Sequence, residues 1–460
     1  MRSPDGASPG AAQIGFWMAT ALVVGNAIGS GIFLLPPALA AFGADNVPGW
    51  LLTAGGAIAL GLVFAALSRQ VPGAGGPYAY TRAAFGDLAA FTVAWAYWIS
   101  IWVGNAAIGT SAVGYAGEFL PWMVATPLNT ALSTLGFVWA LTLVNCIGIR
   151  AAGWVQGVTT MIKLLPLVAA IGLLVWSAPS LGAAVAVRPH FTLGGTAAVA
   201  TLALWAMLGI ESATIPADKV TGAATTVQRA TVVGTVVTVI LSAAGCAAVL
   251  LLVPGPQLAA STAPFATLIG AAWGPAAASA VSLFAATSAV GALNGWILLQ
   301  GELPRAMAAD GLFFRAFGRT TARGTPVTGL LVTSGLVTVL VLLNVHRTLV
   351  GVFTFFVLLA TTASLAAYLA SSLALVRLRT RGKTSGRRSG VALGILGCAG
   401  AAYSVGALAG AGREAVLWGA ALLLAGVPVY AGLRRARSRP PFDGAQGDPE
   451  RAKRAEGPRV

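Results

Sequence analysis

Long apolar segments follow one another along almost the whole chain, separated by short polar stretches rich in glycine and proline. A helix needs about 20 consecutive apolar residues to cross a membrane. Segments of that length predict about twelve membrane-spanning helices, near residues 14–41, 48–69, 87–117, 131–148, 151–177, 195–214, 228–253, 275–303, 327–345, 348–376, 390–409 and 414–433. The first segment continues as a long helix without a cleavage site after a short apolar core, so we interpret it as a span and not as a signal peptide.

Composition supports this interpretation. The 460 residues are 57% hydrophobic and 9% charged, whereas about 25% of the residues in an average soluble domain are charged. We therefore predict an all-α integral membrane protein. The net charge of +15 does not indicate a nucleic-acid partner, because no soluble module interleaves basic and aromatic residues.

Basic residues are divided unevenly between the connections on the two sides. With the N-terminus inside, the outer connections hold Arg188, Arg347 and Arg413, and the inner connections hold a larger set: Arg69, Arg82, Arg150, Lys219, Arg229, Arg305, Arg315, Arg319, Arg323 and the run 377–388. The positive-inside rule then places both termini in the cytoplasm. We expect a multi-pass protein of a bacterial plasma (inner) membrane whose inner basic residues contact anionic lipid headgroups.

The order of spans divides the chain into six parts. These are a cytoplasmic N-terminus (1–13), a first half with helices 1–5 (14–180), a second half with helices 6–10 (190–376), a basic cytoplasmic loop (377–389), helices 11–12 (390–433) and a cytoplasmic tail (434–460). The tail is polar, charged and poor in apolar residues, which predicts disorder.

Cysteine and histidine do not indicate a metal or cofactor site. Cys146, Cys246 and Cys398 fall within predicted spans, with no CxxC pair and no histidine at metal-ligand spacing, so we interpret them as small apolar core residues. His190 and His346 fall in predicted outer loops. We therefore expect no cofactor and no metal.

The first span contains an interruption, GNAIGSGIFLLPP at residues 25–37. In hydrocarbon an unpaired backbone group costs several kcal/mol, so a break is tolerated only where protein or water lines it. Gly25 and Gly29 also form a GxxxG pair, which can serve close packing of two helices. The pattern alone leaves both interpretations open.

The sixth span repeats the feature. Its sequence TLALWAMLGIESATIP places Gly209 in mid-span, followed by the carboxylate of Glu211. Paired interruptions in corresponding members of two five-helix halves indicate an inverted-repeat transporter with its substrate site between two discontinuous helices. There, a half-helix N-terminus can receive a substrate carboxylate and free carbonyls can receive an ammonium group.

Glu211 and Lys163 are the two ionisable residues that fall deep within the predicted spans. Such residues are functional candidates by default, because a charge at the helix centre costs about 2.5–3.5 kcal/mol or more. Lys163 could instead extend its ammonium to the headgroups, but it lies thirteen residues beyond Arg150, which is too deep to reach them easily. We expect both residues to act in gating or proton coupling.

Several motifs resemble those of one known family: GSGIFLLP, PGAGGPYAYTRAAFG, YWISIWVGN, LWAMLGIES, TAPFATL, LNGWILLQGELPRAMAADGLF and AGREAVLWG. Together they resemble the amino acid–polyamine–organocation superfamily, and within it the basic amino acid and polyamine antiporters, including the arginine/agmatine antiporters. The resemblance runs in the same order from the first span to the twelfth. It implies a LeuT-like fold, a five-plus-five inverted repeat with discontinuous helices 1 and 6.

The resemblance also implies roles for individual residues. Residues of the unwound segment would bind the amino-acid backbone, residues of the third helix would close over the ligand, Trp205 would be an aromatic gate, Trp296 would pack on the ligand side chain and Glu211 would be a gating acid. The implied substrate-binding set is Asn26, Gly29, Ser30, Gly31, Ile32, Tyr97, Asn105, Trp205, Leu208 and Trp296.

Three positions depart from the family pattern. The gate tyrosine of the tenth helix aligns with Ala366, with Tyr368 the nearest tyrosine, and a ligand-facing serine aligns with Leu358. Lys163 resembles a fifth-helix lysine of proton-coupled relatives, whose ammonium stands in for the sodium ion of related symporters; the arginine/agmatine antiporters often lack it. Arginine specificity therefore stays open.

We interpret the chain as a secondary transporter for an amino acid or its amine product, working by alternating access as an exchanger or a proton-linked carrier. We favour a cationic substrate, with a neutral amino-acid permease as the alternative. A channel would also place polar groups at the midplane. An enzyme is not expected, because Glu211, Lys163 and scattered Ser and Thr form no set of nucleophile, base and metal. A homodimer is compatible with all of these.

Overall fold

The computed structural model describes most of the chain, namely residues 15–29, 31–71, 75–147, 164–177, 191–215, 217, 220–322, 324–379 and 387–438. This part is built of helices: α1 (Phe16–Ala27), α2 (Leu35–Ala40), η1 (Gly43–Asp45), α3 (Asn46–Gln70), α4 (Gly76–Phe85), α5 (Asp87–Ala116), η2 (Pro121–Met123), α6 (Pro127–Ile147), α8 (Leu164–Ser177), α9 (Leu193–Leu204), η4 (Trp205–Met207), η5 (Ser212–Thr214), α10 (Ala223–Leu252), α11 (Gly255–Ala260), α12 (Pro264–Trp273), α13 (Pro275–Ala309), η7 (Arg315–Gly318), α14 (Val327–Leu343), α15 (Leu349–Leu378), α16 (Arg387–Gly410), α17 (Arg413–Leu424) and α18 (Gly426–Ser438).

Within the described residues, eight helical stretches are long and apolar enough to cross a membrane: Gly43–Gln70, Asp87–Ala116, Pro127–Ile147, Ala224–Leu252, Pro275–Ala309, Leu349–Leu378, Gly390–Gly410 and Arg413–Arg435. Shorter apolar helices accompany them, at Phe16–Ala27, Leu164–Ser177, Leu193–Met207, Pro264–Trp273 and Val327–Leu343. The prediction of an all-α membrane protein is confirmed at this level.

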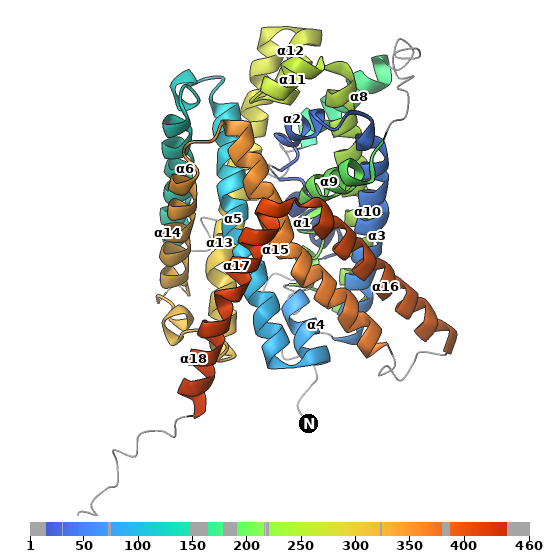
Figure 1. Cartoon of the computed structure of the whole chain (residues 1–460), viewed down its shortest axis with the longest axis vertical. Helices are drawn as coiled ribbons and strands as arrows, with labels where there is room; N and C mark the ends of the chain where they lie inside the picture. Colours follow the sequence, from blue (N-terminus) through green and yellow to red (C-terminus); the bar gives the residue numbers. More distant parts are fainter. Residues whose placement is uncertain are drawn as a thin grey trace, which may run out of the picture.

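Helix α5 is the central helix of the bundle and α17 is peripheral. In the most apolar part of Asp87–Ala116, 89% of the residues are buried, compared with 11% in the most apolar part of Arg413–Arg435. Helices α13 and α15 pack along α5, and Figure 1 shows α6 and α14 together on one side of it and α3, α10 and α16 on the other. Large apolar side chains on the perimeter, such as Trp176 and Leu193, are exposed, as expected for surfaces that face lipid.

Two groups of helices are distinguished by their contacts. Buried polar side chains join α5, α6, α13 and α14: Asn105 donates to Gln300 (2.7 Å), Gln300 donates to Ser334 (2.8 Å), and Asn145 donates to Asn294 (2.9 Å). We call these four helices the cross-linked group. The second group consists of α1, α3, α9 and α10, in which α10 packs on α1 and α3, and α3 packs on α9.

Several helix boundaries and one cysteine differ from the prediction. Helix α18 continues to Ser438, so residues 434–438 are helical and do not belong to a disordered tail as predicted. The apolar segment at 14–41 splits after Ala27 and resumes as a helix at Leu35, because the glycines between them do not continue the helix. Among the cysteines, Cys246 is buried but Cys398 is exposed. The interpretation as a core residue is therefore wrong for Cys398, which lies on the exposed face of α16.

Candidate functional site

The two interrupted helices meet at their breaks. Gly209, after η4, has φ +107°, a conformation that glycine adopts without steric cost. A Cβ atom at this position would lie 3.0 Å from the carbonyl carbon of Asn26 and 3.1 Å from the nitrogen of Ala27. The side-chain amide of Asn26 also donates to Ser212 Oγ at 2.9 Å. The end of α1 and the break after α9 are therefore in direct contact, as the paired interruptions predicted.

A cavity lies beside this contact. It is lined by both broken segments and by one face of α5, with Trp296 from α13; the lining residues are Asn26, Ala27, Gly29, Gly31, Ser100, Ile101, Gly104, Ile108, Trp205, Leu208 and Trp296. Six of the predicted substrate-binding residues are among them: Asn26, Gly29, Gly31, Trp205, Leu208 and Trp296. None of these lining residues carries a formal charge.

The Trp205 indole forms one wall of the cavity and is held between two glycines. A side chain at Gly31 would overlap the indole, and a Cβ at Gly104 would lie 3.2 Å from its Cη2 atom. The indole Nε1 is buried and has no hydrogen-bond partner among the described residues. A buried donor without a partner is costly, so a ligand that offers an acceptor here would recover a hydrogen bond.

Glu211 is the acceptor at the centre of a hydrogen-bonded cluster next to the cavity. Its side chain is fully buried and accepts three hydrogen bonds, from the hydroxyl of Tyr97 (2.6 Å), the hydroxyl of Tyr368 (2.7 Å) and the backbone nitrogen of Gly209 (3.2 Å). The cluster thus joins α5, α15 and the second break through one carboxyl group. We call Tyr97, Glu211 and Tyr368 the carboxylate cluster.

The position of the carboxylate cluster follows from the direction of α5. Tyr97 precedes the lining residues Ser100 and Ile101 by about one helical turn, toward the end of α5 that adjoins α4. The cluster therefore lies on the α4 side of the cavity, where it separates the cavity from that end of the bundle.

Tyr368 is the tenth-helix tyrosine that reaches the second break, although the resemblance placed the gate tyrosine at position 366. The Tyr368 hydroxyl contacts Glu211, whereas Ala366 is half-buried elsewhere on α15. The two positions differ by half a helical turn, and the resemblance of the motifs did not decide between them. Leu358, the other departure on α15, is half-buried and is not among the residues that line the cavity.

The other predicted residues that the structure describes do not line the cavity. Asn105 directs its amide to Gln300 within the cross-linked group, and Ile32 is fully buried behind the break. Ser30 and Lys163 lie outside the described residues, so their predicted roles stay predictions.

Sequence reasoning missed the lining residues Ser100, Ile101, Gly104 and Ile108. The helical repeat from Tyr97 contained the signal, because positions 97, 100, 101, 104 and 108 share one face of a helix. Ser100 also pairs with Ser364 of α15 through their hydroxyls (2.5 Å). The hydroxyl pair is the polar feature of an otherwise apolar α5 face.

An apolar helical bundle with an uncharged cavity between two interrupted helices is the arrangement typical of a secondary membrane transporter. Comparison with known proteins agrees. The chain belongs to the amino acid permease family, whose model matches residues 14–433, and this confirms the family resemblance of the motifs.

Several similar proteins match most of the chain. It is 32% identical over 435 residues to a putative arginine/ornithine antiporter of Bacillus subtilis, covering 85% of this chain and 90% of the relative. It is 30% identical over 426 residues to the putrescine transporter PotE of Escherichia coli, with 91% and 95% covered. It is 34% identical over 343 residues to the cadaverine/lysine antiporter of Escherichia coli, with 72% and 75% covered. The family and these relatives are transporters, not enzymes.

Proposed function

We propose that this protein exchanges a cationic amino acid for an amine across a bacterial plasma membrane by alternating access. The observation that carries the proposal is the cavity at the contact of the two breaks, with backbone groups of Gly29 and Gly31 on one side and Trp296 on another. The printed names of the three relatives all refer to cationic amino acids or diamines, which supports the choice of substrate class.

The cavity suits the common part of such ligands. Half-helix ends at a break present backbone N–H and C=O groups, which match an α-carboxylate and an ammonium group. The unpartnered Nε1 of Trp205 adds a donor next to Gly31. A carboxylate oxygen of the ligand would accept the hydrogen bond of this indole nitrogen.

The cavity recognises a cationic side chain without an acidic residue. Since the lining residues are uncharged, recognition falls to the Trp296 indole, whose face attracts a cation by about 0.5–2 kcal/mol. The hydroxyl pair of Ser100 and Ser364 can also accept a hydrogen bond from an ammonium group.

The proposal includes twelve membrane spans in a LeuT-like five-plus-five inverted repeat. The eight long stretches supply eight of the spans. The other four spans are the broken segments α1–α2 and α9–η4–η5, and the helices α8 and α14. The first two are interrupted, α8 lies next to undescribed residues, and α14 falls just below the length required. Helix α12 then lies in an outer connection.

The inner side is proposed to be the end that carries α4. Arg82 of α4 and Arg305 near the end of α13 belong to the basic set that the positive-inside rule assigns to the cytoplasm. Figure 1 shows α4 at one end of the bundle and α11 and α12 at the opposite end. Both termini would be cytoplasmic. Proton coupling through Glu211 and Lys163, contact with anionic lipids and a homodimer remain part of the proposal.

The function is tested by counterflow in proteoliposomes that contain the full-length protein. Uptake of radiolabelled ornithine, lysine, arginine and putrescine is measured with and without unlabelled substrate inside. We expect saturable uptake that depends on internal substrate. Equal, non-saturating uptake into empty vesicles would favour a channel, and best uptake of alanine, leucine or methionine would favour a neutral amino-acid permease.

The role of Trp296 is tested in the same vesicles. Trp296→Leu should weaken competition by cationic ligands about two- to thirtyfold, with little effect on neutral ones. Trp176→Leu is the matched control, because Trp176 lies on the exposed side of α8 and is 84% exposed. A mutant that treats charged and neutral ligands as the wild type does would remove the cation–π contribution from the proposal.

A further inference from the structure

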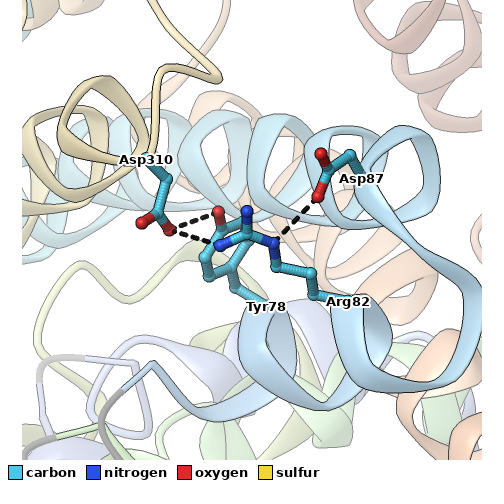
Figure 2. Close-up of polar contacts among 4 residues, drawn as sticks. All are labelled: Tyr78, Arg82, Asp87 and Asp310. Atoms are coloured by element: carbon cyan, nitrogen blue, oxygen red, sulfur yellow. Dashed lines mark hydrogen bonds and ion pairs between the residues drawn. The ribbon is translucent and has the colours of Figure 1, made fainter.

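A polar cluster on the inner end of the bundle connects α4 to α13. The Tyr78 hydroxyl donates to Asp310 Oδ2 at 2.6 Å, and Arg82 Nη1 lies 3.2 Å from the same oxygen. Arg82 Nε donates to Asp87 Oδ1 at 2.8 Å. Figure 2 shows the Arg82 guanidinium between the two carboxylates, with Tyr78 against Asp310. Burial and the bond to Asp310 raise the pKa of Tyr78, so its hydroxyl remains a donor.

The beginning of α4 is attached to the second broken helix. Gly75 N donates to the carbonyl of Ile215 at 3.1 Å, only four residues beyond Glu211. Gly75 and Gly76 have φ of +116° and +48°, and a Cβ at Gly76 would lie 2.8 Å from Thr214 Oγ1. These two glycines permit the tight turn that brings α4 directly onto the segment after η5.

Helix α4 therefore bridges the two groups of helices. One of its ends contacts the segment after η5, which follows the break packed on α1. Its polar side chains reach Asp310, the residue that follows α13 of the cross-linked group. Helix α4 also packs along α5 and α15, and its contacts with Asp310 and Ile215 link α13 to the second broken helix through α4.

The exposure of the cluster suits contacts that form and break. The side chains of Arg82 and Asp310 are 40% and 38% exposed, so water can solvate both when they separate. Exposed ion pairs contribute little individually, whereas the fully buried bonds between Asn105 and Gln300 would leave unsatisfied groups if broken. The α4–α13 contact is thus the weaker of the two kinds of link.

We propose that Tyr78, Arg82 and Asp310 form a second inner gate, in series with the carboxylate cluster, that holds α4 to α13 while the cavity is closed toward the cytoplasm. The gate opens when these contacts separate and the Tyr78 end of α4 moves with Ile215, to which Gly75 is hydrogen-bonded. This role rests on the proposed function as an alternating-access transporter. Tyr78, Arg82 and Asp310 are positioning residues, since none of them lines the cavity.

The test measures access to a reporter thiol behind the gate. Ala213→Cys places a thiol in η5, at a fully buried position, in a full-length background in which Cys146, Cys246 and Cys398 are replaced by alanine. The protein is kept in nanodiscs without substrate, and the rate of reaction with a hydrophilic thiol reagent is recorded. A buried thiol reacts in proportion to the fraction of time that the inner path is open.

Two variants break the gate and one is the matched control. Asp310→Asn and Tyr78→Phe should raise the labelling rate about two- to fivefold, the range expected from losing one or two exposed polar contacts. Asp87→Asn removes the same charge and a partner of Arg82 but leaves the α4–α13 contact intact, so its rate should stay at the wild-type value. The double variant Tyr78→Phe/Asp310→Asn should label at least as fast as Asp310→Asn alone, because the asparagine oxygen can still accept the Tyr78 hydrogen bond.

The outcomes separate this inference from the proposed function. Equal labelling of Asp310→Asn, Asp87→Asn and the parent, or an equal rise in both variants, would overturn the gate. Counterflow with the same preparations tests transport independently: a parent protein that shows the expected labelling pattern but no substrate-dependent exchange would retain the gate and overturn the transport proposal. Tyr78→Phe removes one hydroxyl group only, so it keeps the test decisive if Asp310→Asn does not fold.

Discussion

At the scale of single residues, the carboxyl group of Glu211 organises the α4 side of the cavity. A fully buried carboxylate is tolerated only when hydrogen bonds replace its hydration. Here two tyrosine hydroxyls and one backbone nitrogen do so. Because the donors come from three separate elements, a change in the charge or orientation of this one group affects all three.

We predict that Glu211→Gln leaves ligand binding within about tenfold of the wild type, or about 1.4 kcal/mol, but lowers exchange by an order of magnitude or more. Glutamine preserves the shape, and Glu211 is not among the cavity-lining residues. Its NH₂ group, however, cannot accept the hydrogen bond that one tyrosine donates. Binding and counterflow measured on the same preparation check the prediction.

Glu118→Gln serves as the control for the loss of a carboxylate, since Glu118 is exposed beyond the end of α5. Wild-type exchange by Glu211→Gln would show that the carboxylate cluster plays no part in the transport cycle.

At the scale of elements, the site depends on the close approach of two helix breaks. Gly209 rests on the backbone at Asn26 and Ala27, and Gly31 rests on the Trp205 indole. Neither contact leaves room for a side chain. Gly31 thus belongs to the interruption and also permits close packing against the second broken helix, whereas Gly29 of the GxxxG pair lies against Ala292 of α13.

We expect Gly31→Ala to abolish or strongly weaken ligand binding while the protein still inserts and folds. The added methyl group overlaps the Trp205 indole and would displace it into the cavity. Gly55→Ala, on α3, is the matched control because a Cβ there meets no atom within 4 Å. Binding affinity and thermal stability of the two variants provide the comparison; unchanged affinity in Gly31→Ala would show that Trp205 does not line the ligand site.

At the scale of the whole molecule, a stable group of helices and a group that contains both breaks face each other across the cavity. Buried amide and hydroxyl groups fasten α5, α6, α13 and α14 to one another. In a membrane, where hydrophobic burial does not favour one helix pair over another, such bonds and close packing determine which helices stay together. For the proposed alternating access, we expect the other group to tilt against this one.

Coupling of this motion to protons is the prediction that belongs to this scale. If the Lys163 ammonium binds the broken first helix when charged and releases it when neutral, both Lys163→Ala and Lys163→Arg should flatten the pH dependence of exchange. Alanine is never charged, and arginine stays charged throughout the usable pH range. Exchange rates across pH 5–9 in proteoliposomes test this, with retained binding as evidence of folding; pH profiles like that of the wild type in both variants would contradict it.

Much of the architecture could be predicted from the sequence because hydrocarbon imposes strong rules on it. Long apolar segments must form helices, and glycine- and proline-rich interruptions within them must be covered by protein. The positions of α3, α5, α10, α13 and α15 therefore agree with the predicted spans. The two breaks follow from the same rules, and six of the residues that line the cavity between them follow from the family resemblance.

By itself, the sequence determined that this protein is a helical membrane protein with two interrupted spans, because that information is local to each segment. Only the tertiary structure decided which side chains meet. Asn105 faces Gln300 and not the cavity, Tyr368 and not position 366 contacts Glu211, and Tyr78 reaches Asp310 across 232 positions of sequence. The physical reason is that rotation of a helix about its axis changes every one of these contacts, and in an almost uniformly apolar helix the sequence pattern constrains that rotation only weakly.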